Sequence, residues 1–371
     1  MKVAVGLSGG VDSSVAALLL KRAGHEVVGI TMRLWQEGRY AGGAHDACFG
    51  PGEVEDIAAA AAFAERIGIP YRVFDCANAY EKEILAYFRN TYLDGKTPNP
   101  CVFCNAKMKF GLLPDLAVAQ GLAFDKFATG HYARVEERDG RFALLRAKDT
   151  RKDQSYFLYR LSQSQLARQL FPLGELTKEE VRQIAAEAGL AAADKPDSQD
   201  FYSGDRNELL GAPPREGNIV STDGRVLKRH NGFWNYTIGQ RKGLGIAARE
   251  PLYVVRLDAC RNEVVVGTKD ELTQTEFRVT DMQWGMFAPR RVEDAAPYQR
   301  EGRAPARPQP IPCRVKIRST GEPRGPATFE MDPSGEIVCR MPSGLTGVTP
   351  GQSAVFYEAD GDAVLCGGVI A

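Results

Sequence analysis

The sequence of 371 residues has no excess of charge of either sign, because 47 Lys and Arg residues balance 47 Asp and Glu residues. A nucleic-acid partner would therefore have to meet a local basic surface rather than a globally basic protein. The sequence also has no apolar run long enough to span a bilayer. No basic and apolar leader precedes the first predicted strand at Val3. We therefore expect a cytoplasmic protein without a membrane partner.

Cysteines are few and scattered, and no internal repeat is present. A reducing compartment disfavours a disulfide framework among the eight cysteines. Cys101 and Cys104 alone lie close together in the sequence, so this pair calls for a chemical explanation. We interpret the isolated cysteines as packing thiols; they are Cys76, Cys260, Cys313, Cys339 and Cys366.

A glycine-rich turn near the start of the chain is the most informative motif. An apolar strand from Val3 runs through Gly9 and Gly10 into a predicted helix. The glycines can adopt positive φ and let an oxyanion approach the backbone, while the helix start offers unpaired N–H groups at its positive end. Further donors come from the hydroxyls of Ser8, Ser13 and Ser14. The turn therefore predicts a phosphate site.

Asp12 needs its own explanation, because a carboxylate repels phosphate. We expect it to act through a bound Mg²⁺ ion or to orient the loop. The turn lacks the Gly-Lys-Ser/Thr ending of a Walker A motif and the three-glycine spacing of a dinucleotide fingerprint, which disfavours ordinary kinases and dehydrogenases. It resembles the loop of ATP pyrophosphatases, which adenylylate a substrate oxygen and then displace AMP with a nitrogen or sulfur nucleophile.

Strand and helix signals alternate over the first half of the chain. Strands are predicted at 27–32, 71–74 and 127–132, and helices at 54–67 and 178–188. This order predicts an α/β fold with a doubly wound parallel sheet, whose ligands bind at the carboxyl ends of the strands.

The pattern changes to short, glycine-punctuated strands after about Gly217. Strands are predicted at 217–220, 252–255, 313–317, 327–331 and 353–357, and an irregular Pro- and Arg-rich stretch covers 286–312. We expect an ATP pyrophosphatase domain over 1–210, a small central β-rich domain over 211–275 and a C-terminal antiparallel β-barrel over 276–371.

Four further motifs occur in order: Thr97-Pro98-Asn99-Pro100-Cys101-Val102-Phe103-Cys104-Asn105, Ala128-Thr129-Gly130-His131-Tyr132-Ala133-Arg134, Lys152-Asp153-Gln154-Ser155-Tyr156-Phe157-Leu158, and the stretch from Asn235 to Gly245. With the glycine turn, they resemble the bacterial tRNA-specific 2-thiouridylases. The resemblance covers residues 3 to about 260 and is thinner beyond. It implies that ATP adenylylates the 2-carbonyl oxygen of the wobble uridine, which sulfur from a persulfide then replaces.

The resemblance also implies the nucleotide site. The implied ATP-binding residues are Gly6, Leu7, Ser8, Gly9, Gly10, Val11, Asp12, Ser13, Met32 and Gly130. Met32 and Gly130 lie at the ends of two predicted strands, where the resemblance implies that the adenine and ribose are held. The implied cofactors are ATP and Mg²⁺. We assign no catalytic role to His131.

The resemblance is incomplete at the cysteines. Cys104 occupies the position of the first catalytic thiol of the family, and Cys101 stands where many members have Asp. Tyr202 occupies the position of the second cysteine, which carries the persulfide sulfur. A phenol cannot carry that sulfur. The family mechanism, in which one thiol bears the sulfur and the other resolves the disulfide, therefore cannot operate unchanged.

Three explanations remain open for the thiols. In the first, Cys101 substitutes for the missing partner: one thiolate of the CxxC pair carries sulfur to the activated carbon, and its neighbour resolves the link. Alternatively, Cys101, Cys104 and Cys48 ligate an iron–sulfur cluster, which exogenous sulfide could complete. In the third explanation the pair is structural, or binds zinc, and the protein does not thiolate.

Several residues are candidates for holding tRNA. By motif matching, Asn99, Pro100 and Cys101 would line the pocket of the flipped target base. The residues implied to contact the rest of the tRNA are Lys152, Asp153, Gln154, Gln240, Arg241, Lys242, Arg318 and Ser319. Arg318 and Ser319 stand where relatives have an Arg-Tyr pair, so stacking by the tyrosine is lost. Residues 290–324 include nine Lys and Arg residues and four Asp and Glu residues. This local excess of positive charge would suit contacts with RNA phosphates.

These observations predict an ATP-dependent tRNA uridine 2-sulfurtransferase. Its expected catalytic residues are Cys104, Cys101 and Asp12, and its expected partners are the tRNA anticodon stem-loop and a persulfide or sulfide donor protein. Two alternatives are an amide-forming ATP pyrophosphatase, which would need no thiol pair, and a non-catalytic paralogue that binds ATP and tRNA.

Overall fold

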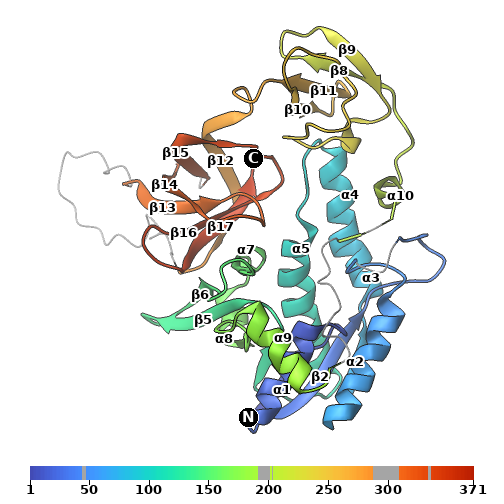
Figure 1. The fold of residues 1–371 in the computed structure, drawn as a ribbon, viewed down its shortest axis with the longest axis vertical. Coiled ribbons are helices and arrows are strands. Elements are labelled where there is room, and N and C mark those ends of the chain that lie inside the picture. Colours follow the sequence, from blue (N-terminus) through green and yellow to red (C-terminus); the bar gives the residue numbers. More distant parts are fainter. Residues whose placement is uncertain (44–46, 191–200, 203, 287–308, 333–335) are drawn as a thin grey trace, which may run out of the picture. The chain divides into compact units, whose positions relative to one another are not determined.

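The computed structural model describes residues 1–43, 47–190, 201–202, 204–286, 309–332 and 336–371 (Figure 1). These residues form two compact units. One consists of Met1–Asp94 and Pro98–Pro214, and the other of Gly95–Thr97 and Arg215–Ala371. Three residues from the first hundred of the chain thus belong to the C-terminal unit.

A parallel sheet with the strand order β3-β2-β1-β4-β7 forms the centre of the first unit. Its strands are β1 (Lys2–Gly6), β2 (Glu26–Arg33), β3 (Tyr71–Asp75), β4 (Lys126–Ala128) and β7 (Gln169–Leu170). The chain winds outward from β1 to β3 and then crosses to β4 on the other side of β1, so the winding reverses between β1 and β4. The prediction of a doubly wound parallel sheet is confirmed, and this reversal is where such sheets bind ligands.

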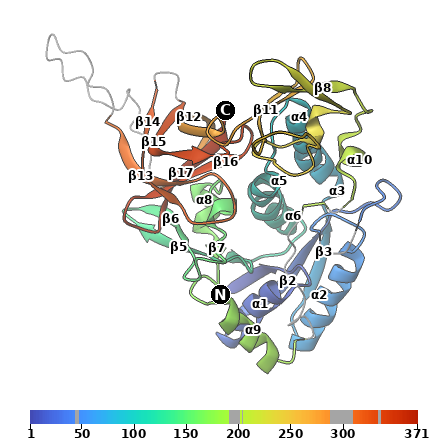
Figure 2. The same cartoon turned by 45° about the horizontal axis from the view of Figure 1, so that its top comes forward.

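Three helices cover one face of this sheet: α1 (Val11–Arg22), α2 (Glu53–Ile67) and α9 (Lys178–Glu187). Alternate residues of β1 point toward them, because side chains alternate between the faces of a strand. Val3 and Val5 therefore share a buried core with Val15 of α1, Phe63 of α2 and Val181 of α9. Figures 1 and 2 both show α1 and α9 side by side.

The other face of the sheet meets helical segments that the sequence did not predict. They are α3 (Ala77–Tyr80), the π-helical η1 (Glu81–Leu85), α4 (Ala86–Leu93), α5 (Pro100–Phe103), the π-helical η2 (Cys104–Leu112) and α6 (Leu113–Ala119). Phe110 of η2 packs edge-on against Phe127 of β4, with ring centroids 5.8 Å apart. Also unpredicted are the hairpin β5 (Ala133–Arg138) and β6 (Arg141–Arg146), with α7 (Ser155–Leu158), α8 (Gln163–Ala167) and α10 (Arg206–Leu210).

The strand predicted at 127–132 is shorter than expected. β4 ends at Ala128, because its neighbour β7 pairs only with Phe127 and Ala128. Thr129, Gly130 and His131 consequently form the connection that leaves the carboxyl end of β4. The predicted helix at 178–188 and strands at 27–32 and 71–74 match α9, β2 and β3.

The second unit contains a mixed sheet of order β10-β11-β8-β9 and a closed antiparallel barrel. The sheet strands are β8 (Gly217–Ser221), β9 (Val226–His230), β10 (Tyr253–Asp258) and β11 (Glu263–Gly267), with the short helix η4 (Phe233–Asn235). The barrel strands, in the order β12-β15-β14-β13-β16-β17, are β12 (Thr273–Trp284), β15 (Ile337–Thr346), β14 (Arg324–Met331), β13 (Ile311–Lys316), β16 (Ser353–Glu358) and β17 (Val364–Ile370). The expected β-rich region and C-terminal barrel are confirmed.

The interior of the barrel is filled by alternate side chains of its strands. Phe329 and Phe356 are buried with ring centroids 5.0 Å apart. Cys313, Cys339 and Cys366 belong to the same core, and Cys76 is buried in the first unit, which supports their interpretation as packing thiols. The interpretation is wrong for Cys260, which is exposed in the turn between β10 and β11.

Residues Gly95–Thr97 are attached to the loop that follows β15. The Thr97 N–H donates to the carbonyl of Pro350 at 2.8 Å, and the Gln352 side-chain amide donates to the carbonyl of Thr97 at 3.2 Å. Gly351 has φ +88°, and a Cβ there would lie 2.8 Å from the Thr97 oxygen. The close approach of the two backbones therefore requires glycine.

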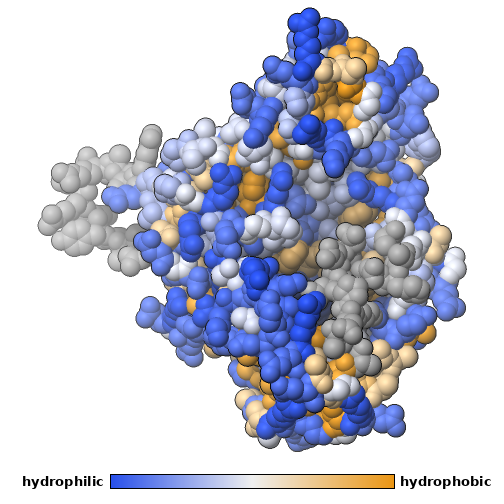
Figure 3. Space-filling model, in the orientation of Figure 1, coloured by the Kyte–Doolittle hydropathy of each residue, from blue (hydrophilic) through white to orange (hydrophobic). Residues whose placement is uncertain are grey.

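No helix within the described ranges is long and apolar enough to cross a membrane. The face drawn in Figure 3 is mainly hydrophilic, with hydrophobic residues in small separate patches. Large hydrophobic side chains that are exposed include Val54, Val118 and Val226. Isolated residues of this kind are usual on protein surfaces.

Phe356→Ala should remove about 3–5 kcal/mol from the free energy of unfolding of the barrel, because it leaves a cavity against Phe329. Hydrogen exchange measured by mass spectrometry should accelerate in β13, β14 and β16, while β1 in the other unit stays protected. Val226→Ala is the matched control, since Val226 is 57% exposed. Unchanged exchange in β16 of the Phe356 variant would contradict this account of the barrel core.

Candidate functional site

The glycine turn and the start of α1 form a loop with its own internal hydrogen bonds. The Ser13 hydroxyl accepts from the Ser8 N–H at 3.2 Å and lies 3.2 Å from the Ser8 hydroxyl. Ser13 and Ser14 also donate to the Gly10 carbonyl, at 3.2 and 2.9 Å. Gly10 precedes α1, and no side chain caps the helix there. The first N–H groups of α1 therefore lack a side-chain acceptor, as an anion site requires.

The loop packs tightly against α2 through Gly9. Gly9 has φ +72°, and a Cβ there would lie 2.5 Å from the backbone oxygen of Asp56. Both the conformation and the space therefore demand glycine. Leu7, Val11 and Ser13 are buried, whereas Ser8 is exposed. A nucleotide would meet this loop mainly through its backbone and the Ser8 hydroxyl.

Gly130 packs against the other side of the same loop. A Cβ at Gly130 would lie 2.6 Å from the Asp12 carbonyl carbon and 2.6 Å from the Ser13 nitrogen. The connection after β4 therefore touches the first turn of α1 with nothing but backbone between them. Sequence matching singled out Gly130 as a nucleotide-binding residue, and the geometry adds that it fixes the position of the loop.

Asp12 is held by two groups that sequence reasoning did not connect to it. The Lys178 ammonium donates to both Asp12 carboxylate oxygens, at 2.8 and 2.9 Å, and the Tyr132 hydroxyl donates to Oδ1 at 2.9 Å. This arrangement fits an ion pair rather than a Mg²⁺ site, because an ammonium already binds both oxygens. Of the two roles expected for Asp12, orientation of the loop is the one that these contacts support.

A cavity of about 310 Å³ lies beside the carboxyl ends of β2 and β3. Its lining includes Arg33, Trp35, Glu53 and Asp75. Glu53 accepts from the N–H groups of Leu34 and Trp35 at 2.8 Å each, and burial raises its pKa. Met32 is the residue before Arg33 in β2, so it lies at the same end of the sheet.

Cys101 and Cys104 lie one helical turn apart where α5 continues into η2. Residues at i and i+3 share a helix face, so the two thiols lie on the same side. Pro100 is the first residue of α5 and is buried, as is Asn99 before it. The Asn99 N–H donates to the Tyr87 hydroxyl at 3.1 Å, and its amide donates to the Tyr156 hydroxyl at 3.3 Å. These contacts fix the turn ahead of the thiols.

Both thiols are protonated at neutral pH in this environment. Burial raises the pKa of Cys101 to about 12 and that of Cys104 to about 11. The nearby Lys109 ammonium opposes burial and lowers both pKa values. Sequence reasoning missed Lys109, although a lysine five residues after a reactive cysteine on a helical segment is a signal for this effect.

The segment around Tyr202 is packed against the loop that contains Cys48. The Phe49 N–H donates to the Phe201 carbonyl at 3.1 Å, and the Phe49 and Tyr202 rings lie 6.1 Å apart. The Tyr202 hydroxyl donates to Glu208, and burial raises the Tyr202 pKa to about 12. The other residues of the motif around Tyr202, Lys195–Asp200, lie outside the described residues.

Cys48 is exposed, and it precedes the residue that pairs with Phe201. Tyr80 lies between this loop and the CxxC segment: its ring stacks on Phe49 at 5.1 Å. Burial raises the Tyr80 pKa, and negative charge on Cys104, Cys48 or Cys101 raises it further. Cys48 thus lies beside the position where the family has its second thiol.

Within the part of the chain that the structure describes, no three His, Cys, Asp or Glu side chains are spaced to hold a metal ion. Cys48, Cys101 and Cys104 share an environment without meeting that spacing. The arrangement as it stands therefore does not fit an iron–sulfur cluster, and we derive no step through one.

Among the residues implied to contact tRNA, Asp153 and Gln154 serve the scaffold. The Asp153 carboxylate is fully buried and accepts from the Ala147 N–H and the Ser155 hydroxyl at 3.1 and 2.9 Å. The Gln154 side chain accepts from the Tyr132 N–H at 2.9 Å, which positions the tyrosine that binds Asp12. A direct contact of Asp153 with tRNA, as the motif implied, disagrees with this burial. Lys152 remains partly exposed.

In the second unit, Gln240 builds the turn that presents two cations. Its side-chain amide accepts from the Thr237 N–H at 3.1 Å and donates to the Lys242 carbonyl at 3.0 Å. Arg241 and Lys242 are exposed on that turn. Arg318 and Ser319 are also exposed, and a Cβ at Gly239 would lie 3.3 Å from the Arg318 guanidinium. The structure therefore brings Arg318 to the turn that carries Arg241.

The predicted basic stretch at 290–324 is described only in part. Arg290, Arg291, Arg300, Arg303 and Arg307 lie outside the described residues. Lys316 is buried, and Arg314 donates to the carbonyls of Glu358 and Gly361, so these two cations support the barrel rather than a phosphate path. Arg318 and Arg324 are the exposed members within 309–332.

His131 is half-buried between Thr129 of the connection after β4 and Phe110 of η2. Its Nδ1 lies 2.7 Å from the Thr129 hydroxyl, and its ring centroid lies 5.5 Å from that of Phe110 in η2. Burial, reinforced by the Lys109 charge, holds the pKa of His131 well below its usual range. His131 thus packs η2 against the connection that carries Gly130.

The chain matches known protein families over most of its length. Residues 1–202 match the family described as tRNA methyl transferase HUP domain. Residues 210–268 match the tRNA methyl transferase PRC-barrel domain, and residues 297–370 match the Aminomethyltransferase beta-barrel domain.

Curated relatives match the whole chain. The tRNA-specific 2-thiouridylase MnmA of Endomicrobium trichonymphae is 45% identical over 376 residues, which cover 100% of this chain and 99% of the relative. The protein of the same name from a Picosynechococcus strain is 46% identical over 381 residues, covering 100% and 98%. A solved structure of NMN synthetase from Francisella tularensis is 18% identical with a TM-score of 0.33, over 57% of this chain and 72% of that one.

Gly130→Ala should weaken ATP binding about 10- to 100-fold, because the added methyl group pushes the first turn of α1 out of position. Isothermal titration of the full-length protein with ATP measures the effect. Gly50→Ala is the control, since a Cβ at Gly50 meets nothing within 4 Å. ATP affinity equal to that of the wild type in the Gly130 variant would show that the loop does not depend on this contact.

Alkylation of Cys104 by iodoacetamide should accelerate about tenfold per pH unit between pH 7 and pH 10, because the thiolate fraction rises tenfold per unit below the pKa. Lys109→Met should slow the reaction at pH 8, since the pKa rises when the cation is lost. Peptide mass spectrometry gives the rate at each thiol.

Lys107→Met is the matched control for this experiment, because Lys107 is exposed in the same helical segment and pairs with Glu83 at 2.6 Å. A rate that does not change with pH, or equal effects of the two lysine variants, would contradict the electrostatic role of Lys109.

Proposed function

Because this chain belongs to the tRNA-specific 2-thiouridylase family, we propose that it uses ATP to replace the 2-carbonyl oxygen of the tRNA wobble uridine with sulfur. The observation that carries the proposal is the identity of 45% to a 2-thiouridylase over 100% of this chain. The phosphate loop and the CxxC pair also occur in one compact unit, as a reaction that needs both requires.

The first step proposed is activation of the uracil carbonyl. The 2-carbonyl oxygen attacks the α-phosphorus of ATP, the bond to the bridging oxygen breaks, and pyrophosphate leaves with the electron pair. The N–H groups at the start of α1 and the Ser8 hydroxyl would bind the phosphates. Asp12 would keep the loop in position through its bonds to Lys178 and Tyr132.

The second step proposed is sulfur transfer through the CxxC pair. A persulfide on Cys104 attacks C2 of the activated uracil, and AMP leaves with the former carbonyl oxygen. Cys101 then attacks the Cys104 sulfur, which releases 2-thiouridine and leaves a Cys101–Cys104 disulfide. A donor protein would supply the persulfide sulfur, and a cellular thiol would reduce the disulfide. The shared helix face of the two cysteines supports this exchange.

Several finer parts of the site belong to the same proposal. Met32 would hold the adenine and Gly130 the ribose, with Gly6–Ser13 at the phosphates. Mg²⁺ would accompany the nucleotide phosphates, since this ion usually keeps few protein ligands. The division into domains at 1–210, 211–275 and 276–371 is likewise a proposal, as is the cytoplasmic location.

Residues of each unit, taken separately, are candidates for contacting tRNA. Asn99, Pro100 and Cys101 would face the flipped base, and Lys152 would contact the tRNA beside it. Arg241, Lys242, Arg318 and Ser319 supply an exposed polar surface on the second unit that suits phosphates of the anticodon stem-loop. Two alternative functions remain. In an amide-forming ATP pyrophosphatase, the CxxC pair would have no role in catalysis. A non-catalytic paralogue would bind ATP and tRNA without forming 2-thiouridine.

Cys104→Ser and Cys101→Ser should each reduce 2-thiouridine formation to background, because a hydroxyl can neither carry the sulfur nor resolve the link. Full-length protein is incubated with ATP, tRNA and a persulfide donor, and the nucleosides are quantified by mass spectrometry. Cys260→Ser is the control, since Cys260 is exposed in a turn of the second unit.

Cys48→Ser separates the explanations of the thiols. Thiol exchange between Cys101 and Cys104 predicts normal product, whereas a cluster held by three cysteines predicts loss of product together with loss of iron from anaerobically purified protein. Product formation by Cys104→Ser would overturn the sulfur-transfer step. Absence of product from the wild-type protein with any sulfur donor would favour the non-catalytic paralogue.

A further inference from the structure

Lys178 lies where local electrostatics disfavour a cation. It is the first residue of α9, and the N-terminus of a helix carries partial positive charge. Its side chain is only 6% exposed, so water does not screen the ammonium. A residue that breaks a local rule in this way often serves a site rather than the fold.

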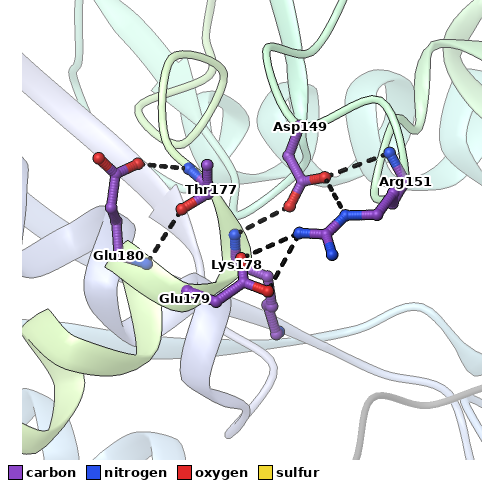
Figure 4. Close-up of polar contacts among 6 residues, drawn as sticks. All are labelled: Asp149, Arg151, Thr177, Lys178, Glu179 and Glu180. Atoms are coloured by element: carbon purple, nitrogen blue, oxygen red, sulfur yellow. Dashed lines mark hydrogen bonds and ion pairs between the residues drawn. The ribbon is translucent and has the colours of Figure 1, made fainter.

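Several hydrogen bonds and ion pairs at the start of α9 hold Lys178 in place. Thr177 and Glu180 form a capping box that fixes the start of α9 (Figure 4). The Asp149 carboxylate accepts from the Lys178 N–H at 3.1 Å, and Arg151 in turn contacts Asp149 and Glu179. These contacts hold the backbone of Lys178 and leave its side chain to reach Asp12.

At Asp12 the ammonium meets the phosphate loop itself. Its two bonds to the carboxylate measure 2.8 and 2.9 Å, and it lies 5.7 Å from the centre of the Tyr132 ring. Asp12 is the second residue of α1, whose first N–H groups lack a side-chain cap. The Asp12 side chain is 26% exposed, so the ion pair borders solvent on the side of the loop.

An ion pair is not required to hold α1 and α9 together. The two helices already share a buried apolar core that includes Val15, Ala16, Val181 and Ala185. The charge pair instead lies at the carboxyl edge of the sheet, beside the reversal of winding between β1 and β4. There the ammonium offsets the negative charge of Asp12 beside a loop shaped for phosphate.

We propose that Lys178 is the positioning residue that orients Asp12 and supplies the positive charge facing the pyrophosphate part of ATP. The proposal rests on the proposed function, since it assigns a residue to the activation step. When the α-phosphorus bond to the bridging oxygen breaks, negative charge grows on pyrophosphate. A preorganised ammonium in a water-poor site stabilises that charge. Lys178 neither gains nor loses a proton in this step.

The test compares ligands with and without the pyrophosphate part. Isothermal titration measures the affinities of full-length wild type, Lys178→Met and Lys178→Arg for ATP, inorganic pyrophosphate and AMP, without tRNA or sulfur donor. Lys178→Met should bind ATP and pyrophosphate about 10- to 100-fold more weakly, while AMP binding changes less than about threefold. Lys178→Arg retains the charge and should recover part of the loss.

Lys126→Met is the matched control, because Lys126 is a partly buried lysine in the same unit whose ammonium donates to the Ala167 carbonyl. Its affinities for all three ligands should equal those of the wild type. Circular dichroism checks that each variant is folded. If Lys178→Met does not fold, Lys178→Arg must still bind pyrophosphate more tightly than AMP, in the wild-type order.

An equal loss for AMP and ATP in Lys178→Met would show a merely structural role and overturn the proposal, as would unchanged pyrophosphate binding. Asp12→Asn gives a second readout: the Mg²⁺ concentration for half-maximal ATP binding should stay unchanged if Lys178, rather than the metal ion, is the partner of Asp12. Wild-type protein that binds none of the three ligands would refute the proposed function itself.

Discussion

The ion pair between Asp12 and Lys178 connects positions 166 residues apart and decides how the phosphate loop is held. On one side the loop meets the backbone of α2 at Gly9, and on the other it meets the connection after β4 at Gly130. These approaches leave little freedom for the first turn of α1. The Lys178 ammonium pairs with the carboxylate that would otherwise repel phosphate, so its negative charge is offset from within the protein.

At the CxxC pair, burial rather than an ion pair determines the state of the side chains. Cys101 and Cys104 are kept protonated by burial, and Lys109 limits that effect without cancelling it. Such thiols react slowly with solvent oxidants, because the thiolate is the reactive form. Cys48, in contrast, is exposed and precedes Phe49, whose N–H donates to the Phe201 carbonyl.

The sequence predicted the parallel sheet and the barrel because each leaves a local pattern of apolar strands separated by turns. It also predicted that the glycine turn leads into a helix, whereas phosphate binding by this turn stays a prediction. It did not predict the helical run from Ala77 to Ala119, whose π-helical segments break the usual periodicity. The role of Lys178 also escaped, since its partner is remote in sequence. The motif implied tRNA contacts for Asp153 and Gln154, which stay predictions; it did not show that Asp153 is buried or that both side chains bind backbone N–H groups.

The attachment of Gly95–Thr97 to the loop at Pro350–Gln352 bears on how the molecule can be divided. A fragment that begins at Arg215 would lack the backbone that occupies this loop and would leave the Pro350 carbonyl without its donor. A fragment that ends at Pro214 would carry three orphaned residues directly ahead of the CxxC segment. A cut between Pro214 and Arg215 therefore separates Gly95–Thr97 from the unit to which these residues belong.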